Sequence, residues 1–302
     1  MKASVSKITC ANRCAKKYDY NYVQKIVPIV TDERLTRGRL LHASLEAHYL
    51  KQDWTKPIEE YERKSVDEEE KLMIAECYRI MRSYLTRYRS DNFEVLAVEM
   101  PFEVETPDGN TYEGIIDLIY KDDYGVWVCD HKTVKAIPDE STRAIDMQTN
   151  LYFYATEKLG YNPTGIVFNY LRTKSPTQPK LLKSGGLSKA KNIDTDYETY
   201  SVAIKNAGLN PDDYADILQE VKANRFFSRI KVPRPAKLVE NMVKEFDDSC
   251  KRIESSVGLY PRTFNMNCSW DCGYRELCNA EIAGIGSDVI RSISYKEKEE
   301  RK

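Results

Sequence analysis

Two aspartates and a lysine fall on neighbouring predicted strands that are joined by a turn at residues 122–125. With this turn, Asp117 pairs directly with Asp130, and Lys132 lies on the same face two residues further along. Like charges in direct opposition, partly desolvated by aliphatic neighbours, destabilise a hairpin unless a cation lies between them. The pattern therefore predicts a site for Mg²⁺ or Mn²⁺. The alternative is a pair of ordinary strand-end acids, because a slip of one residue in register would separate them onto opposite faces.

Two further candidate groups lie on predicted helices. Gln148 and Tyr152 are four residues apart and share a helix face that is otherwise apolar. A buried amide needs a hydrogen-bond partner, because leaving it unpaired costs about 1–3 kcal/mol. Gln148 would therefore orient Lys132 or a phosphate group, or alternatively cap a strand carbonyl. His42, on an earlier predicted helix, is either a buried histidine with a satisfied ring or a metal ligand.

Three of the eight cysteines, Cys268, Cys272 and Cys278, lie close together near the C-terminus. Such crowding in a chain without a secretory segment indicates metal binding rather than disulfides. The chain has only 3 histidines, so a metal site here must use mainly thiolates and carboxylates. A tetrahedral site needs a fourth ligand, and the spacing alone does not separate zinc from an iron–sulfur cluster.

The elements that must position these residues follow from the periodicity of the chain. Helical spacing of apolar residues starts after Ser4 or Ser6, with Cys10, Cys14 and Tyr18 in one series, and recurs at 33–51, 57–89, 144–159, 198–223 and 234–256. Strand patterns occur at 93–104, 111–120, 126–132, 165–171 and 226–232. The order of these elements predicts a single α/β domain with a mixed sheet and helical decoration.

Two segments have compositions typical of exposed chain. Residues 174–200 are rich in Ser, Gly, Lys, Pro and Thr, and their basic part, 180–192, is either a mobile flap over a strand or a surface loop. The tail at 295–302 is nearly all charge and predicts a solvated or frayed end.

The composition limits the class of protein. The chain has 302 residues, enough for one large domain, and its 46 basic and 47 acidic side chains exclude a polycation that coats DNA non-specifically. A local basic groove remains compatible with this balance, and near the site it would use Arg37, Arg39, Lys135, Arg143, Arg172 and Lys174. No apolar run approaches the roughly 20 residues of a membrane span. We therefore expect a soluble protein of a reducing compartment, the cytoplasm.

An Asp on one strand followed by Asp130-His-Lys132 on the next resembles the core of the PD-(D/E)XK nucleases. The surroundings resemble the RecB-like exonuclease branch, which includes the AddB nuclease domain and CRISPR-associated relatives. That branch carries a helical histidine upstream, here in GRLLHASLE, and Gln-x-x-x-Tyr on the helix after the lysine, here QTNLY. The motifs cover roughly residues 4–172 and 264–280. The resemblance implies a restriction-endonuclease-like core, metal-dependent hydrolysis of DNA, and a bacterial or phage-infected cell as the setting.

The resemblance also implies a role for each residue. The metal ligands would be His42, Asp117, Asp130 and the backbone carbonyl of His131. Lys132 would orient the attacking water and stabilise charge on the phosphate, with Gln148 and Tyr152 orienting Lys132 or the DNA. Glu99 resembles an acidic position that supports the site in this branch, and Glu46 is a weaker candidate.

Many RecB-like nucleases hold an iron–sulfur cluster with a remote N-terminal cysteine and a Cys-x-x-Cys-x5-Cys run. The resemblance therefore implies a 4Fe–4S cluster on Cys14, Cys268, Cys272 and Cys278, with Cys10 as the competing fourth ligand and zinc as the competing metal. This chain has one extra residue between Cys268 and Cys272. The cluster would join the first helix to the C-terminal segment.

We expect residues 1–294 to form a single nuclease domain with a catalytic core at about 33–172. A helical insertion would follow at about 174–256, then the cysteine segment 264–280. The expected activity is that of a Mg²⁺- or Mn²⁺-dependent exonuclease on DNA ends or single strands, in recombination, repair or phage DNA metabolism, with a helicase or recombinase as partner. The alternatives are a DNA-binding assembly subunit that does not cleave and a structure-specific endonuclease.

Overall fold

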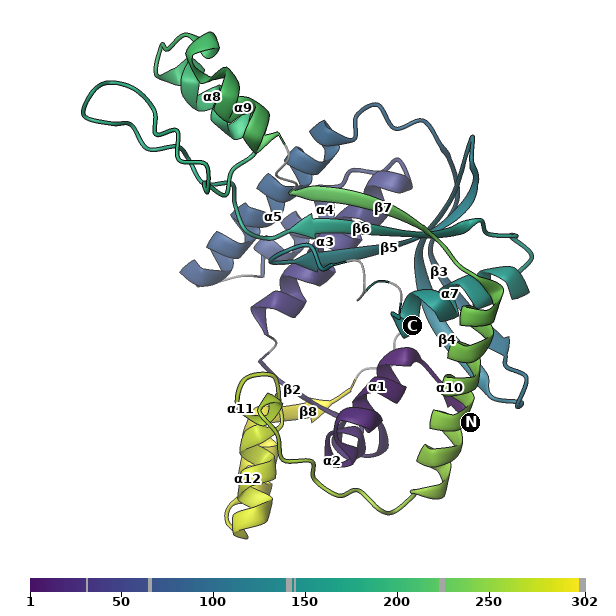
Figure 1. The fold of residues 1–302 in the computed structure, drawn as a ribbon. Helices are drawn as coiled ribbons and strands as arrows, with labels where there is room; N and C mark the ends of the chain where they lie inside the picture. Colours follow the sequence, from purple (N-terminus) through teal and green to yellow (C-terminus); the bar gives the residue numbers. More distant parts are fainter. Residues whose placement is uncertain (31, 65–66, 140–142, 144, 223–225, 299–302) are drawn as a thin grey trace.

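The computed structural model describes residues 1–30, 32–64, 67–139, 143, 145–222 and 226–298. Its centre is a six-stranded mixed sheet in the order β1-β4-β5-β6-β7, with β3 also paired to β4 (Figure 1). The strands are β1 (Lys2–Ala3), β3 (Glu94–Glu105), β4 (Thr111–Asp122), β5 (Gly125–Val134), β6 (Gly165–Arg172) and β7 (Phe227–Pro233). The five predicted strands are all present, and the predicted mixed α/β sheet flanked by helices is confirmed.

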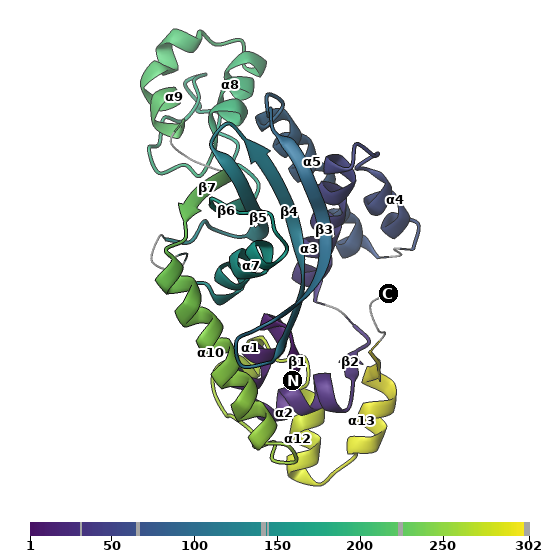
Figure 2. The same ribbon diagram turned by 90° about the vertical axis from the view of Figure 1, so that its right-hand side faces the viewer.

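Helices cover both faces of this sheet (Figure 2). α3 (Glu33–Tyr49) and α5 (Glu68–Arg87) pack on one face, and α7 (Met147–Lys158) and α10 (Ala236–Ser255) pack on the other. Because both faces are covered, β6 is buried along nearly its whole length and reads as one apolar run. Its residues alternate between the two cores, and so do those of β5. The strand residues that face α3 and α5 are Leu118, Tyr120, Trp127, Cys129, Val167 and Leu171.

The prediction of one long helix at 57–89 is wrong, because this stretch forms two helices. The structure has α4 (Lys56–Glu62) and α5 in its place, and residues 65–66 lie outside the described chain. A new helix begins because Asp67 acts as an N-cap, with its carboxylate accepting a hydrogen bond from the backbone N–H of Glu70. The break lets α4 and α5 form separate contacts with α3.

The helix predicted at 198–223 is likewise divided, into α8 (Tyr197–Asn206), the 3₁₀ turn η2 (Pro211–Tyr214) and α9 (Ala215–Val221). Gly208, with φ of +65°, turns the chain after α8, and Pro211 cannot donate the hydrogen bond that a continued helix requires. Two predicted helix ends lie outside the described chain. They are residue 223, the last of this helix, and residue 144, the first of the helix predicted at 144–159.

The three segments α8, η2 and α9 form a small helical unit with its own core, which includes Tyr200, Tyr214 and Ile217. The basic loop 180–192 packs on this unit, because Lys189 lies 4.8 Å from the centroid of the Tyr214 ring. Beyond the unit, β7 pairs with β6 in the central sheet, and α10 packs against α7. The helical unit and its loop therefore stand apart from the sheet, whereas β7 is one of its strands (Figure 1).

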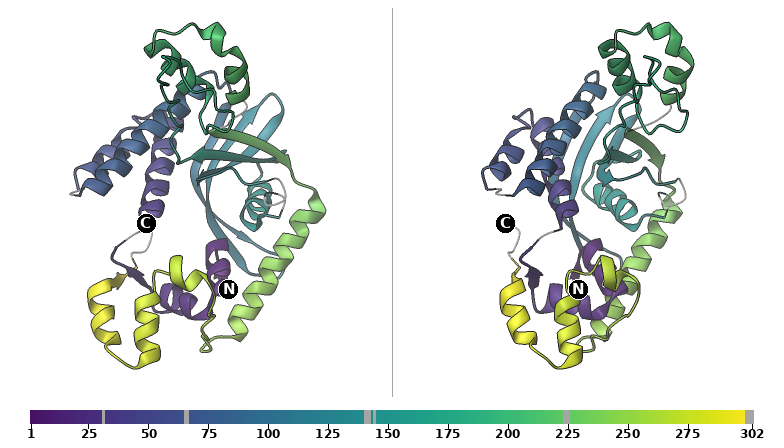
Figure 3. Two further views of the ribbon diagram at one scale, coloured as in Figure 1. Left: turned by 60° about the vertical axis from the view of Figure 1, so that its left-hand side comes forward. Right: turned by 90° about the vertical axis from the view of Figure 1, so that its left-hand side faces the viewer.

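The two ends of the chain meet in a second small unit, at the end of the molecule opposite α8 and α9 (Figure 3). It contains α1 (Val5–Arg13), α2 (Ala15–Tyr18), η1 (Asp19–Val23), β2 (Ile26–Pro28), α11 (Asn267–Trp270), α12 (Arg275–Ala283), α13 (Ser287–Ser294) and β8 (Tyr295–Glu297). The Ser4 side chain caps α1, which confirms one of the two predicted caps.

The predicted frayed tail is wrong for its first residues. Tyr295–Glu297 forms β8, which pairs antiparallel with β2, and the Tyr295 ring is buried against Tyr274. A charged stretch can form a strand here because Lys296 and Glu297 are both exposed to solvent while the Tyr295 ring packs inward. Residues 299–302 lie outside the described chain. No helix in the described ranges is long and apolar enough to span a membrane.

Asp247 on α10 connects this helix to the β3–β4 hairpin. It is 1% exposed, and its Oδ1 accepts hydrogen bonds from Thr106 Oγ1 at 2.5 Å and Asn110 Nδ2 at 2.8 Å. We expect Asp247→Ala to lower the free energy of unfolding by about 2–4 kcal/mol, because it leaves buried donors unpaired. Urea denaturation measures this, and Asp248→Ala, one residue along and half exposed, should change stability by less than about 0.5 kcal/mol. Equal losses in both variants would show that the buried hydrogen bonds do not stabilise the fold.

Candidate metal centre and cysteine pocket

The candidate site lies where β4 and β5 separate. Their ladder pairs Lys121 with Val126, which confirms the predicted register, but it ends at Leu118 and Cys129, one residue short of the predicted direct pair of Asp117 with Asp130. Asp117 and Asp130 are the next residue of each strand, so they lie at the point of divergence. On the same edge of β4, β1 pairs only with residues 111 and 112, which leaves residues 113–117 of this edge outside both ladders. The gap gives side chains from other elements access to the two aspartates.

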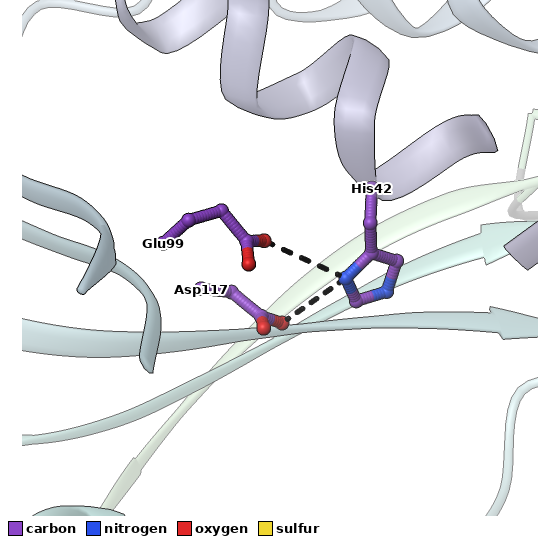
Figure 4. A group of neighbouring side chains, drawn as sticks. All are labelled: His42, Glu99 and Asp117. Carbon is purple, nitrogen blue, oxygen red and sulfur yellow. Dashed lines mark ion pairs between the residues drawn. The ribbon is translucent and has the colours of Figure 1, made fainter. Parts of the chain in front are cut away.

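His42 enters this gap from α3 (Figure 4). Its Nδ1 lies 3.7 Å from Asp117 Oδ2 and 3.9 Å from Glu99 Oε1. One ligand atom from each of these three residues lies within 4.8 Å of the other two. One imidazole nitrogen and two carboxylate oxygens are donors that suit Mn²⁺ or Mg²⁺. Within the described chain, Glu46 is not part of this group.

Glu99 was predicted only to support the site, but its carboxylate lies 3.9 Å from His42 Nδ1, within the group of candidate metal ligands. Its backbone has φ of +41°, in the left-handed region that is unfavourable for a residue with a side chain. Glu99 follows an irregularity in β3, where the register shifts between Val95 and Ala97. Strained backbone of this kind persists where the surrounding structure imposes it, and here it accompanies a carboxylate directed at His42 and Asp117 (Figure 4).

Asp130 lies beside the lysine and glutamine of the predicted site. Its carboxylate is buried, and its Oδ2 lies 3.0 Å from Lys132 Nζ. Lys132 Nζ donates to Gln148 Oε1 at 3.0 Å, and Gln148 Nε2 donates to Tyr152 OH at 2.7 Å. Gln148 therefore orients Lys132 rather than capping a strand carbonyl. All four side chains form one connected group across β5 and α7.

His131 contributes its backbone to the site and its ring to the core. The backbone N–H donates to Asp117 Oδ2 at 2.7 Å, which ties the two strands together where their ladder has ended. The ring is buried, and its Nδ1 lies 2.8 Å from Asn169 Nδ2. Asn169 was not singled out from the sequence, although a lone amide within the apolar strand GIVFNYL is the signal that would have found it.

The charges of the site are unfavourable without a cation. Burial raises the pKa of Asp117 to about 6, and burial together with Asp117 raises the pKa of Asp130 to about 7. Asp130 Oδ2 accepts no hydrogen bond of normal geometry from the residues that the structure describes. Burial also lowers the pKa of His42, which keeps its ring neutral and able to bind a metal. The donor set therefore fits a divalent cation.

Metal binding should strengthen as the pH rises. Below about pH 6 both aspartates hold protons that a bound cation must displace, so we expect Mn²⁺ affinity to rise at least about 100-fold between pH 5 and pH 8. Calorimetric titration of the metal-free protein with Mn²⁺, in buffers of different ionisation enthalpy, measures both the affinity and the protons released. Asp130→Asn, which removes one titrating group, should bind weakly at every pH and release fewer protons. An affinity independent of pH in the wild type would contradict this assignment.

Most of the predicted basic groove has other partners. Arg37 forms ion pairs with Glu33 and Glu76, and both Arg172 and Lys174 pair with Asp194. These side chains stabilise the fold locally, so the prediction that they line a phosphate groove is weakened. The Arg143 guanidinium likewise donates to the carbonyl of Pro138. Arg39 and Lys135 are exposed.

The four predicted cluster cysteines lie around one pocket. Cys14, Cys268, Cys272 and Cys278 all line it, and Cys10 does not. The backbone at Cys14 is extended, with φ of −166°, and this residue separates α1 from α2. The single helical series expected from Cys10 through Tyr18 is therefore wrong, and the break directs Cys14 away from the face that Cys10 occupies.

The pocket is also basic. Its lining includes Lys16, Lys17, Arg262 and Arg275, and Arg262 Nε donates to Cys278 Sγ at 3.3 Å. Cations and N–H donors next to sulfur stabilise thiolates, whereas burial raises the pKa of the Cys272 thiol. All four cysteines are free in the described structure. The donor set therefore fits a metal group held by thiolates.

His42 and Asp117 meet where two strands of a mixed sheet separate, beside the ion pair of Asp130 with Lys132, and this arrangement is typical of nucleases. The chain belongs to the PD-(D/E)XK nuclease superfamily, whose family model matches residues 2–279. Members of this superfamily use divalent metals. The restriction-endonuclease-like fold expected from the sequence is thereby confirmed.

Two solved structures are similar to this chain. One is a crystal structure of a Eubacterium rectale protein described provisionally as an exonuclease, with 10% identity, 90% of this chain and 86% of that chain covered, and a TM-score of 0.49. The other is the crystal structure of SSO0001, with 16% identity, 83% and 88% coverage, and a TM-score of 0.32. No curated protein sequence matches the chain.

Proposed function

We propose that this nuclease is a Mg²⁺- or Mn²⁺-dependent exonuclease of the RecB-like branch, acting on DNA ends or single strands. The observation that carries the proposal is the position of Lys132, whose Nζ lies 3.0 Å from Asp130 Oδ2 beside the group of His42, Glu99 and Asp117. The RecB-like assignment rests on the order of the sequence motifs, from His42 to Tyr152.

His42, Glu99, Asp117 and Asp130 are the side chains that would hold the cation. When bound, the cation lowers the pKa of a water molecule and neutralises charge on the phosphate. The protein residues place the cation and the phosphate next to one another, which is most of what phosphodiester hydrolysis requires.

Lys132 acts as a positive charge rather than as a base. Burial lowers its pKa, but Asp130 outweighs burial and raises the pKa of Lys132 above its ordinary value. The side chain therefore remains an ammonium group at neutral pH and cannot accept a proton from water. It donates hydrogen bonds to the attacking water and to a phosphate oxygen, and Gln148 holds it in place.

The cysteine pocket is proposed to hold a 4Fe–4S cluster on Cys14, Cys268, Cys272 and Cys278. Tetrahedral zinc holds its thiolates about 3.8 Å apart, because each Zn–S bond is about 2.3 Å long. No three of these sulfur atoms lie within 4.8 Å of one another in the described chain. The preference for a 4Fe–4S cluster over zinc rests on the resemblance of the cysteine run to that of the RecB-like nucleases.

The biological setting extends the same proposal. We infer that the enzyme acts in the cytoplasm, in recombination, repair or phage DNA metabolism, beside a helicase or recombinase that supplies a DNA end. The free cysteines support a reducing compartment. The exposed Arg39 and Lys135 are available for phosphate contacts.

A time course on DNA labelled at one end tests the activity, with Mg²⁺ and Mn²⁺ supplied in turn. We expect linear DNA to lose its label progressively from the ends while closed circular DNA remains intact. Nicking of the circular DNA would instead indicate a structure-specific endonuclease. No cleavage of either substrate with either metal would indicate the non-cleaving assembly subunit.

A further inference from the structure

Three polar residues form a row across the buried face of the central sheet. In the strand registers, His131 of β5 is the partner of Asn169 of β6, and Asn169 is the partner of Arg229 of β7. Residues at paired positions project from the same face of a sheet. This face is the apolar core beneath α3 and α5, and Asn169 is 0% exposed within it. An amide and a guanidinium in such a core require partners.

Hydrogen bonds connect the row to two tyrosines of the covering helices. Asn169 Nδ2 donates to Tyr84 OH at 2.8 Å and lies 2.8 Å from His131 Nδ1. Arg229 Nη2 donates to Tyr84 OH at 2.7 Å and to Tyr49 OH at 3.1 Å, and the two hydroxyl groups are 2.8 Å apart. A connected hydrogen-bond network therefore runs from the Arg229 guanidinium to the His131 imidazole.

Arg229, at the outer end of this hydrogen-bond network, is anchored by two further contacts. Arg229 Nη1 donates to Asp91 Oδ2 at 2.5 Å, and the guanidinium lies 3.7 Å from the centroid of the Tyr88 ring. The Arg229 side chain is only 16% exposed. Burying a charge in this way rarely stabilises a fold more than apolar packing would, whereas it can fix the position of its partners. The buried Arg229 charge therefore indicates a role in positioning the residues that it contacts.

At its inner end, the hydrogen-bond network reaches the candidate metal centre through His131. The His131 ring stacks on Tyr49 at 5.8 Å and meets the His42 ring edge-on at 5.8 Å. Its backbone N–H is the group that binds Asp117 Oδ2. Asn169 and Tyr49 hold the ring of His131, and the main chain of His131 holds Asp117 at the point where the β4–β5 ladder no longer does so.

We propose that Arg229, Tyr84 and Asn169 are positioning residues that hold His131, and through it Asp117 and His42, in the geometry that binds the cation. They act through His131, to which Asn169 is joined directly. The proposal rests on the proposed function, and it adds residues from α5, β6 and β7 to a site otherwise built from α3, β3, β4, β5 and α7. Residues that orient metal ligands typically change metal affinity about 10- to 100-fold when they are replaced.

The test is titration of the full-length, metal-free protein with Mn²⁺ alone. Asn169→Leu keeps the branching of the side chain but replaces the amide by methyl groups, which removes both hydrogen bonds, and we expect it to weaken Mn²⁺ binding about 10-fold or more. Tyr84→Phe removes one hydroxyl group with almost no change in shape, and we expect a loss of about 3- to 10-fold. The matched control is Val167→Ala, on the same strand and the same buried face, which should bind Mn²⁺ within about twofold of the wild type although it is less stable. DNA cleavage by Asn169→Leu should recover as the Mn²⁺ concentration is raised.

The outcomes separate this proposal from the proposed function. Wild-type affinity in both Asn169→Leu and Tyr84→Phe, or an equal loss in Val167→Ala, would overturn the positioning role alone. An Asp130→Asn variant that binds Mn²⁺ as the wild type does would overturn both proposals, because the cation would not be held at this site. Should Asn169→Leu fail to fold, Tyr84→Phe decides the question.

Discussion

We expect Asp130→Asn to abolish DNA cleavage and, in the absence of metal, to gain stability relative to the wild type as the pH rises to 8. The loss of cleavage should be at least about 1,000-fold, because the variant loses a carboxylate that holds the cation and the negative charge opposite Lys132. The gain in stability follows from the raised pKa of Asp130. Its carboxyl group has a pKa of about 7 in the folded protein and about 4 when unfolded, so ionisation above pH 7 opposes folding.

The sign of this effect is opposite to that of an ordinary ion pair. A raised carboxyl pKa means that the folded protein retains a proton that the unfolded chain releases, so stability falls as the pH rises from about 4 to about 7. The neutral amide of Asp130→Asn does not titrate, so we expect the stability of the variant relative to the wild type to rise by about 1–3 kcal/mol between pH 4 and pH 8. Urea denaturation at the two pH values, beside the cleavage assay, measures both effects.

Asp122→Asn is the matched control, because Asp122 lies at the other end of the same hairpin. It accepts hydrogen bonds from Trp127 and Lys231 and contacts none of the candidate site residues. The Lys231 side chain lowers its pKa, although burial opposes this, so its replacement should reduce stability slightly and leave cleavage unchanged. If Asp130→Asn cleaved DNA at the wild-type rate, or if Asp122→Asn were equally inactive, the assignment of the site would be wrong.

If the pocket holds the proposed cluster, we expect Cys14→Ser to weaken the connection between the first helices and the C-terminal segment and to remove the colour of the protein. We expect the wild type to be brown, with broad absorption near roughly 400 nm, and Cys14→Ser to be colourless. The loss of free energy of unfolding should be at least about 3 kcal/mol, because a bound metal group contributes directly to folding. Absorption spectroscopy, iron and zinc analysis and thermal unfolding measure these changes.

Cys10→Ser provides the control, since Cys10 is one helical turn away but does not line the pocket. It should keep both its colour and its iron. A bleached Cys10→Ser beside a coloured Cys14→Ser would reverse the choice of the fourth ligand. A colourless wild type that contains zinc would replace the cluster by a zinc site. In either case the hydrolytic site would be unaffected, because it uses none of these cysteines.

The residues of the hydrolytic site were predictable because most of them are close in sequence. The register that places Asp117 opposite Asp130 depends on a short turn and on alternating hydrophobicity, both of which are local. The spacing of Gln148 and Tyr152 on one helix face is local too. The approach of His42 came only from the order of motifs in a known family, since nothing within α3 distinguishes it from a buried histidine.

What the sequence determined by itself was the type and order of the strands, the hairpin register and the identity of the acidic and thiol groups. The tertiary structure alone decided how far β4 and β5 stay paired, the strained backbone at Glu99, the break at Cys14 and the pairing of β8 with β2. It also decided that Asn169 and Arg229 stand in line with His131. The physical reason is the range of the interactions. Turns, caps and alternation act over a few residues, whereas these features arise where segments distant in the chain pack together and impose a geometry that neither segment would adopt alone.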